Sequence, residues 1–175
     1  LTTLGFLHEI GKGVPQDHRL AAQLYRKAAD QGYANAQTNL GVLYHNGQGL
    51  PKDYREAANW FRKAADQDEA SAQTNLAFLY DLGNRGEPQD YGKAAFWYRK
   101  AADQGHPNAQ TNLALLYETG HGVPKEYRKA EMWYRRAANQ GYANAQANLA
   151  SLYAQGLGVP QDFKLAFDWA RKAAE

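Results

Sequence analysis

The side chains with the most regular spacing in this sequence are asparagines. Asn39, Asn75, Asn112 and Asn148 follow one another at intervals of 36, 37 and 36 residues, with Thr3 at the equivalent position near the start. An asparagine amide offers two donors and an acceptor, so a ladder of such amides could hold the backbone of an extended peptide of any sequence. In the alternative interpretation each amide bonds a neighbouring helix or loop carbonyl and only fixes the fold. Both interpretations stay open at this level.

Catalytic and metal-binding chemistry finds little support in the sequence. Serine occurs only at Ser71 and Ser151, and neither lies in a nucleophile-elbow motif. The histidines are scattered without paired-ligand spacing, and cysteine is absent. The recurring glycine pairs, such as GKG and GQG, are those that turns between helices need. We therefore predict no enzymatic activity, no catalytic residue, no metal site and no cofactor.

The composition of the 175-residue chain also narrows the kinds of partner. Apolar residues make up 44%, which is ample for a packed core, and 20 basic residues offset 18 acidic ones to leave a formal charge of +2. No broad basic footprint for nucleic acid is present, and no apolar run is long enough to cross a bilayer. Because Leu1 is not methionine and lies inside a repeat, we expect a fragment from which any signal segment is missing. Cytoplasm, periplasm and secretion all stay open.

The elements that carry the asparagines belong to an internal repeat. NAQTNL at Asn35 returns as SAQTNL at Ser71, NAQTNL at Asn108 and NAQANL at Asn144. We predict a single array of five units, at about 1–34, 35–70, 71–107, 108–143 and 144–175, with the first unit truncated. A period of this length is typical of a solenoid, whose core forms between neighbouring units.

Each unit is expected to fold as two helices. In the second unit Ala36, Leu40, Leu43 and Tyr44 share one face of a first helix that Gly47 ends, here called the A helix. The following B helix starts after an N-cap residue, which is Asp17, Asp53, Asp90, Glu126 or Asp162 in the successive units. Glu126 is a poor cap, so that helix start should be weaker. The loop LGNRGEPQD from Leu82 holds one additional residue, which explains the 37-residue interval.

Small and aromatic side chains recur on the B helices and predict the core. Alanine fills two positions, at 21, 57, 94, 130 and 166 and at 28, 64, 101, 137 and 173. Such repetition predicts close backbone approach, because a larger side chain would overpack the contact. Tryptophan recurs at 60, 97, 133 and 169, followed by an aromatic residue at 61, 98 and 134, with Tyr25 equivalent in the first unit and Ala170 in the last.

This pattern of A-Q-x-N-L-G/A-x-L-Y, then G-x-G-V-P-x-D-Y, then W-Y/F-x-x-A-A-x-Q-G resembles the Sel-1-like repeat, a relative of the tetratricopeptide repeat. The departures are His8, Leu24 and the QDEA end of the second unit. The resemblance implies an all-α solenoid, a right-handed superhelix of antiparallel helix-turn-helix units whose A helices line a concave groove. The close identity between units also leaves an engineered consensus array open.

By this resemblance the asparagine ladder faces the groove, and two further rows flank it. The first row is Phe6, Val42, Phe78 and Leu115, and the second includes His45, Asp81 and Glu118. An exposed apolar row usually marks a partner site, and the acidic members of the second row would favour a basic partner. In the alternative, the apolar residues pack between adjacent A helices.

The resemblance implies a bacterial protein-interaction scaffold that binds a peptide or partner protein in the groove. Two alternatives stay open. One is β-lactam binding or hydrolysis, which has been linked to cysteine-rich relatives, although this chain lacks their cysteines. The other is a purely structural module that self-associates through uncapped ends, where Leu165 and Trp169 are expected to be partly exposed.

Overall fold

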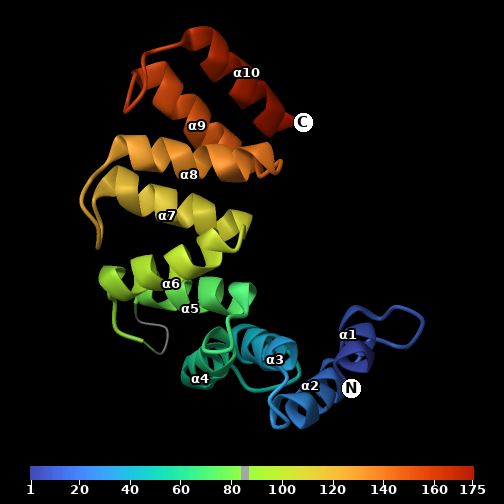
Figure 1. Ribbon diagram of the computed structural model, residues 1–175. Helices are drawn as coiled ribbons and strands as arrows, with labels where there is room; N and C mark the ends of the chain where they lie inside the picture. Colours follow the sequence, from blue (N-terminus) through green and yellow to red (C-terminus); the bar gives the residue numbers. More distant parts are fainter. Residues whose placement is uncertain (84–86) are drawn as a thin grey trace. The chain divides into compact units, whose positions relative to one another are not determined.

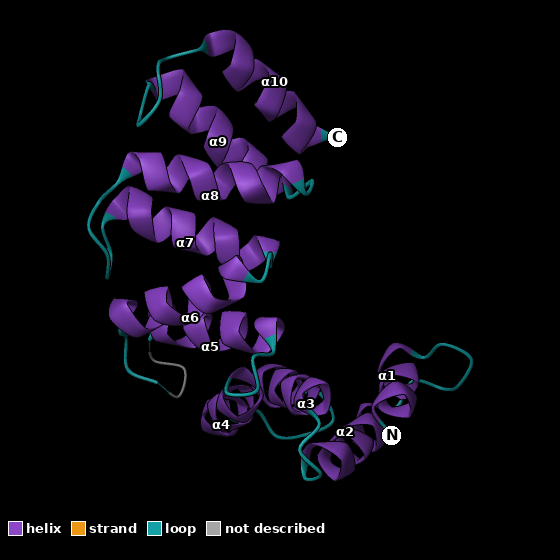
Figure 2. Cartoon of the chain, viewed as in Figure 1, coloured by secondary structure: helices purple, strands orange, loops and turns teal. Residues whose placement is uncertain are grey.

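The computed structural model describes residues 1–83 and 87–175 of the chain. Figures 1 and 2 show a succession of α-helices joined by loops, and the described residues include no β-strand. The ten helices are α1 (Thr2–Ile10), α2 (His18–Ala29), α3 (Ala34–Asn46), α4 (Tyr54–Ala65), α5 (Ala70–Leu82), α6 (Tyr91–Asp103), α7 (Pro107–Thr119), α8 (Tyr127–Asn139), α9 (Ala143–Gln155) and α10 (Phe163–Ala174). The odd-numbered helices are the predicted A helices, and the even-numbered helices are the B helices.

The helices form two compact units, which are described separately. Leu1–Gln89 contains α1 to α5, and Asp90–Glu175 contains α6 to α10. Within each unit every helix packs against the next one along the chain. Short loops between packed neighbours make consecutive helices antiparallel (Figure 1). The all-α solenoid of helix pairs predicted from the sequence is therefore confirmed.

The predicted core positions are buried. Both alanine positions are almost fully buried in the first four repeats, and Tyr25, Phe61, Tyr98 and Tyr134 are almost fully shielded as well. Gly41 shows how closely the helices approach, because a Cβ atom added there would lie 2.6 Å from the Phe61 ring. The small residue at this position of the A helix thus makes room for the aromatic ring of the B helix.

The aspartate caps also form as predicted. The carboxylate of Asp53 accepts hydrogen bonds from the backbone N–H groups of Arg55 and Glu56 at 2.9 and 3.1 Å. Asp17, Asp90 and Asp162 cap α2, α6 and α10 in the same manner. Glu126 begins α8 without a side-chain cap bond, and its carboxylate instead lies 2.8 Å from Lys129 Nζ. Glu126 therefore fails to cap its helix, as predicted, and the weaker helix start stays a prediction.

Two expectations about loops and ends have different outcomes. Residues 84–86, within the loop predicted to hold one additional residue, lie outside the described residues. The expectation of an exposed Trp169 is wrong, because that ring is 7% exposed. Leu165 is half-buried, whereas Phe163 and Phe167, four residues apart on α10, are exposed. The tryptophan packs inward within its own helix pair, and the phenylalanines form the uncovered side of this helix.

Candidate functional site

The asparagine ladder lies on four A helices, and each of its members is half-buried. Asn39 interacts with the hydroxyl of Tyr25, and Asn148 interacts with the hydroxyl of Tyr134. In both cases the tyrosine belongs to the preceding B helix. These two amides therefore contribute to contacts between consecutive helices through a hydroxyl and not through the carbonyl of the structural interpretation, while their half-exposed surface leaves room for a partner.

The other two asparagines have different surroundings. Asn112 Nδ2 donates a hydrogen bond of 3.1 Å to Asn108 Oδ1, one turn earlier on the exposed side of α7. Asn75 forms no side-chain hydrogen bond with any residue that the structure describes. A role of the ladder in holding a peptide backbone stays a prediction.

The tyrosines beside the ladder are anchored by acidic residues of the second row. The Tyr25 hydroxyl donates a hydrogen bond of 2.6 Å to Glu9 Oε2, and the Tyr134 hydroxyl donates one of 2.8 Å to Glu118 Oε2. Burial, followed by the hydrogen bond to the carboxylate, raises the pKa of each tyrosine well above its usual range. Glu118 is therefore already engaged within the fold. Asp81 is half-buried and accepts a hydrogen bond from Gln89 Nε2 at its backbone carbonyl.

Members of the predicted apolar row are only partly buried. Phe6, Phe78 and Leu115 are 49%, 38% and 43% exposed, and Val42 is half-buried. Burial between adjacent A helices therefore accounts for only part of their surface. Phe6, Val42 and Phe78 lie in the unit Leu1–Gln89, and Leu115 lies in the unit Asp90–Glu175.

A hollow of about 430 Å³ lies over the A helices of the unit Leu1–Gln89. Thr3 and Asn39, the ladder positions of α1 and α3, both line it, and so does the exposed ring of Phe6. The remaining lining residues are Thr2, Asn35, Thr38, Glu69 and Ser71. Thr38 Oγ1 and Glu69 Oε2 are joined by a hydrogen bond of 2.9 Å. The hollow thus combines an apolar ring with several hydrogen-bonding groups.

A second, smaller cavity of about 190 Å³ lies in the same unit where α3, α4 and α5 meet. Its lining residues are Val42, His45, Asn46, Phe61, Asn75, Phe78 and Leu79. Four residues of the predicted site, Val42, His45, Asn75 and Phe78, are therefore brought together here. The sequence predicts these positions as rows along a surface but does not predict the cavity.

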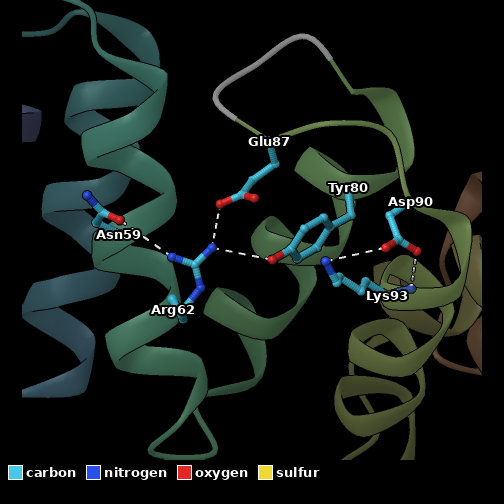
Figure 3. A network of polar contacts seen from close by, with 6 residues as sticks. All are labelled: Asn59, Arg62, Tyr80, Glu87, Asp90 and Lys93. Atoms are coloured by element: carbon cyan, nitrogen blue, oxygen red, sulfur yellow. Dashed lines mark hydrogen bonds and ion pairs between the residues drawn. The ribbon is translucent and has the colours of Figure 1, made fainter.

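Polar residues on the B helices form a separate set of contacts. Figure 3 shows Arg62 bonded to Glu87, to the Tyr80 hydroxyl at 3.3 Å and to Asn59 Oδ1 at 3.4 Å. The hydrogen bond to Tyr80, followed by the interaction with Glu87, raises the pKa of Arg62. Arginines at equivalent positions bond a tyrosine of the following A helix in the pairs Arg26–Tyr44, Arg99–Tyr117 and Arg135–Tyr153. These contacts join consecutive helices and belong to the framework.

Buried glutamines, which the sequence analysis does not predict, join each A helix to the preceding B helix. Gln37 Nε2 donates to the carbonyl oxygen of Ala29 at 3.1 Å, and Gln110 Nε2 donates to that of Ala102 at 3.1 Å. Gln73 and Gln146 do the same one unit further along. The constant Gln in every NAQTNL segment is the signal that could have revealed them. Each glutamine satisfies a carbonyl at the end of the preceding B helix.

The described residues assemble no recognisable catalytic or metal-binding group. Ser151 Oγ accepts a hydrogen bond of 2.7 Å from Gln155, and Ser71 lines the larger hollow without a described hydrogen-bond partner. In residues 1–83 and 87–175, His, Cys, Asp and Glu do not gather into a group that could hold a metal ion. None of the described helices is both long and apolar enough to span a bilayer.

Comparison with protein families matches the Sel1 repeat five times, to residues 4–33, 34–69, 70–106, 107–142 and 143–175. No curated protein sequence matches significantly. Among solved structures, a Sel1 repeat protein from Oxalobacter formigenes is 38% identical, with a TM-score of 0.92 over 99% of this chain and 68% of that one.

Two further solved structures are informative. A protective antigen of uropathogenic Escherichia coli with an SLR fold is also 38% identical, with a TM-score of 0.91 over 99% of this chain. This chain covers 37% of that protein. Cysteine rich protein B of Helicobacter pylori is 25% identical, with a TM-score of 0.55 over 70% of this chain and 87% of that one. This chain shares its fold without any cysteine.

Proposed function

The chain belongs to the Sel1 repeat family, whose members are generally protein-interaction scaffolds rather than enzymes, and we propose that it binds a peptide or partner protein on the surface of its A helices. The proposal takes the five sequence units as a single array. It assigns the chain no catalytic activity of its own.

The observation that carries this proposal is the larger hollow over α1 and α3. Thr3 and Asn39 present hydroxyl and amide groups to it, and the half-exposed ring of Phe6 lies beside them. Amides and hydroxyls can bond a peptide backbone, while an exposed aromatic ring supplies apolar contact area. A hollow with both features suits an extended peptide.

Peptides selected from a random display library on the immobilised chain would test the proposal. We expect Phe6→Ala and Asn39→Ala each to raise the Kd of the selected peptides about tenfold, a loss of about 1.4 kcal/mol. Asn59→Ala, on the surface of α4 away from the hollow's lining residues, is the matched control and should leave the Kd unchanged.

A second control separates binding from packing. Tyr25→Phe removes the hydroxyl that Asn39 contacts without altering a residue that lines the hollow. If Tyr25→Phe weakened binding as much as Asn39→Ala, the asparagine would act through the fold. Peptides that bound both A-helix variants normally would contradict the proposal.

Self-association through the last helix stays a separate prediction. Phe163 and Phe167 lie one helical turn apart on α10, and both are exposed. Sedimentation velocity over a hundredfold range of concentration would reveal it, and a Phe163→Glu, Phe167→Glu variant should then remain monomeric. A concentration-independent sedimentation coefficient for the original chain would exclude it.

A further inference from the structure

The smaller cavity lies where the second repeat has no tyrosine beside the ladder. Phe61 stands at the position that Tyr25 and Tyr134 occupy in the first and fourth repeats. His45 likewise stands where those repeats have Glu9 and Glu118. The cavity of about 190 Å³ is lined by both substituted residues and by Asn75, the ladder asparagine of the next A helix.

In the first repeat, a hydroxyl group joins the three equivalent positions. The Tyr25 hydroxyl donates to Glu9 Oε2 at 2.6 Å, and Asn39 interacts with the same hydroxyl. The fourth repeat has the same arrangement of Tyr134, Glu118 and Asn148. In the second repeat Phe61 has no hydroxyl, so His45 and Asn75 have no such group between them.

Two polar groups beside the cavity consequently lack partners among the described residues. The Asn75 amide makes no side-chain hydrogen bond there, and His45 Nε2 is shielded from water without a partner. His45 Nδ1 lies 3.0 Å from Asn46 Oδ1, which can only accept, so Nδ1 is the donor. In the neutral imidazole Nε2 is then an acceptor. A hydroxyl in the cavity can accept a hydrogen bond from the Asn75 amide, whereas the shielded Nε2 atom of His45 is out of its reach.

The other residues that line the cavity indicate the polarity and size of the group that it binds. Val42, Phe61, Phe78 and Leu79 are apolar, and the lining includes no Asp, Glu, Lys or Arg. A charged side chain would lose its hydration there without an opposite charge to replace it. The volume is below the range of roughly 300–1,000 Å³ that is usual for sites of drug-sized molecules, which favours a single side chain.

We propose that this cavity binds a phenolic side chain, such as a tyrosine of the bound peptide, whose hydroxyl takes the place of the one that Phe61 lacks. The aromatic ring lies against Phe78 and Val42, and the hydroxyl accepts a hydrogen bond from the Asn75 amide. This inference rests on the proposed function, because it names one side chain that the A-helix surface takes from its partner.

Small aromatic probes test the cavity without a peptide. Titration of p-cresol into the ¹⁵N-labelled chain should shift the backbone amide signals of Val42, Asn75 and Phe78. Toluene, which has the same ring and methyl group but no hydroxyl, should bind at least threefold more weakly. Equal binding of the two probes, or shifts confined to other residues, would overturn the proposal.

Two variants test the role of the hydroxyl. In Asn75→Ala the preference for p-cresol over toluene should fall to near unity while toluene still binds. In Phe61→Tyr the new hydroxyl should occupy the polar end and weaken p-cresol binding about tenfold. This variant is expected to fold, because Tyr25 already packs against Gly5 as Phe61 packs against Gly41. Unchanged binding of p-cresol by a folded Phe61→Tyr variant would contradict the inference.

The outcomes separate this inference from the proposed function. If library peptides bind and depend on Phe6 and Asn39, but p-cresol is not preferred over toluene, only the phenolic site is wrong. If p-cresol binds as expected while no peptide is selected, the cavity is a small-molecule site and the scaffold proposal fails. Enrichment of tyrosine among selected peptides, lost on Phe61→Tyr, would support both.

Discussion

The hydroxyl of Tyr134 on α8 donates a hydrogen bond of 2.8 Å to Glu118 Oε2 on α7. Asn148, on α9, interacts with the same hydroxyl, so one group links three consecutive helices. Tyr25 repeats this arrangement with Glu9 and Asn39 on α1 to α3. A single oxygen at each of these places therefore contributes both to the stability of a repeat and to its attachment to the next one.

Replacing Tyr134 by phenylalanine should destabilise the chain by about 1–2 kcal/mol, because the buried hydrogen bond to a carboxylate is lost. For a protein of this size the Tm should fall by about 2–4 °C for each kcal/mol. Tyr33→Phe is the control, since the Tyr33 side chain is exposed. Thermal melts followed by circular dichroism measure both variants, and equal Tm values would show that the Tyr134 hydroxyl contributes nothing.

The raised pKa of Tyr134 predicts a loss of stability in alkali. In the unfolded chain a tyrosine ionises near pH 10, whereas the folded chain keeps this proton to higher pH. The contribution is therefore complete below about pH 10 and is lost as the pH rises beyond it. Urea unfolding at several values between pH 8 and 11 measures how the free energy of unfolding falls as the pH rises. The fall should be shallower in Tyr134→Phe than in the original chain, by about 1.4 kcal/mol per pH unit at the alkaline end. Identical slopes would refute this assignment.

Much of the fold is predictable from the sequence because its determinants are local or recur at one period. The cap of Asp53 depends only on the next three residues. A small residue, glycine or alanine, recurs at the position of Gly41 in every unit, where it faces an aromatic ring of the B helix in the first two. Position within the repeat then identifies the recurring alanines as core residues, and these are buried in the first four repeats.

The candidate site is less predictable because it depends on how three helices meet. Asn39 and Asn75 both lie in an AQTNL segment, yet Asn39 has a tyrosine hydroxyl beside it and Asn75 lines a cavity. The difference comes from residue 61, fourteen positions before Asn75, and is invisible until the side chains are placed. The prediction that Trp169 is exposed is wrong for a related reason, since burial of its ring depends on the packing of α10 against α9 and not on a following unit.

Glu126 offers a way to stabilise the chain. Its carboxylate forms no cap bond at the start of α8, whereas Asp162 Oδ1 accepts from Leu165 N at 2.9 Å at the start of α10. Glu126→Asp should add about 0.5–1 kcal/mol, because the shorter side chain can reach the first backbone N–H groups. The ion pair with Lys129 that would be lost is exposed and contributes little. Asp162→Glu is the reciprocal control and should lower stability, and a Glu126→Asp variant with an unchanged or lower urea midpoint would rule out the cap as the cause of the weak start.

Gly13 and Gly49 occupy equivalent loop positions in the first and second repeats. Comparing alanine variants at the two positions distinguishes the cost of backbone strain from the cost of pushing neighbouring repeats apart. Both have positive φ angles, of 76° and 70°, so an alanine at either position costs about 1–2 kcal/mol for the left-handed conformation alone. A Cβ atom at Gly49 would lie 2.2 Å from the carbonyl oxygen of His18 at the start of the preceding B helix, whereas one at Gly13 would meet nothing within 4 Å.

Gly49→Ala should therefore destabilise the chain by about 1–3 kcal/mol more than Gly13→Ala, because two backbone segments must move apart. Urea unfolding of the two variants measures this difference directly, with the common conformational cost cancelling between them. Equal losses would mean that the loop of one repeat can withdraw from the preceding B helix without cost, and that this contact does not hold consecutive repeats together.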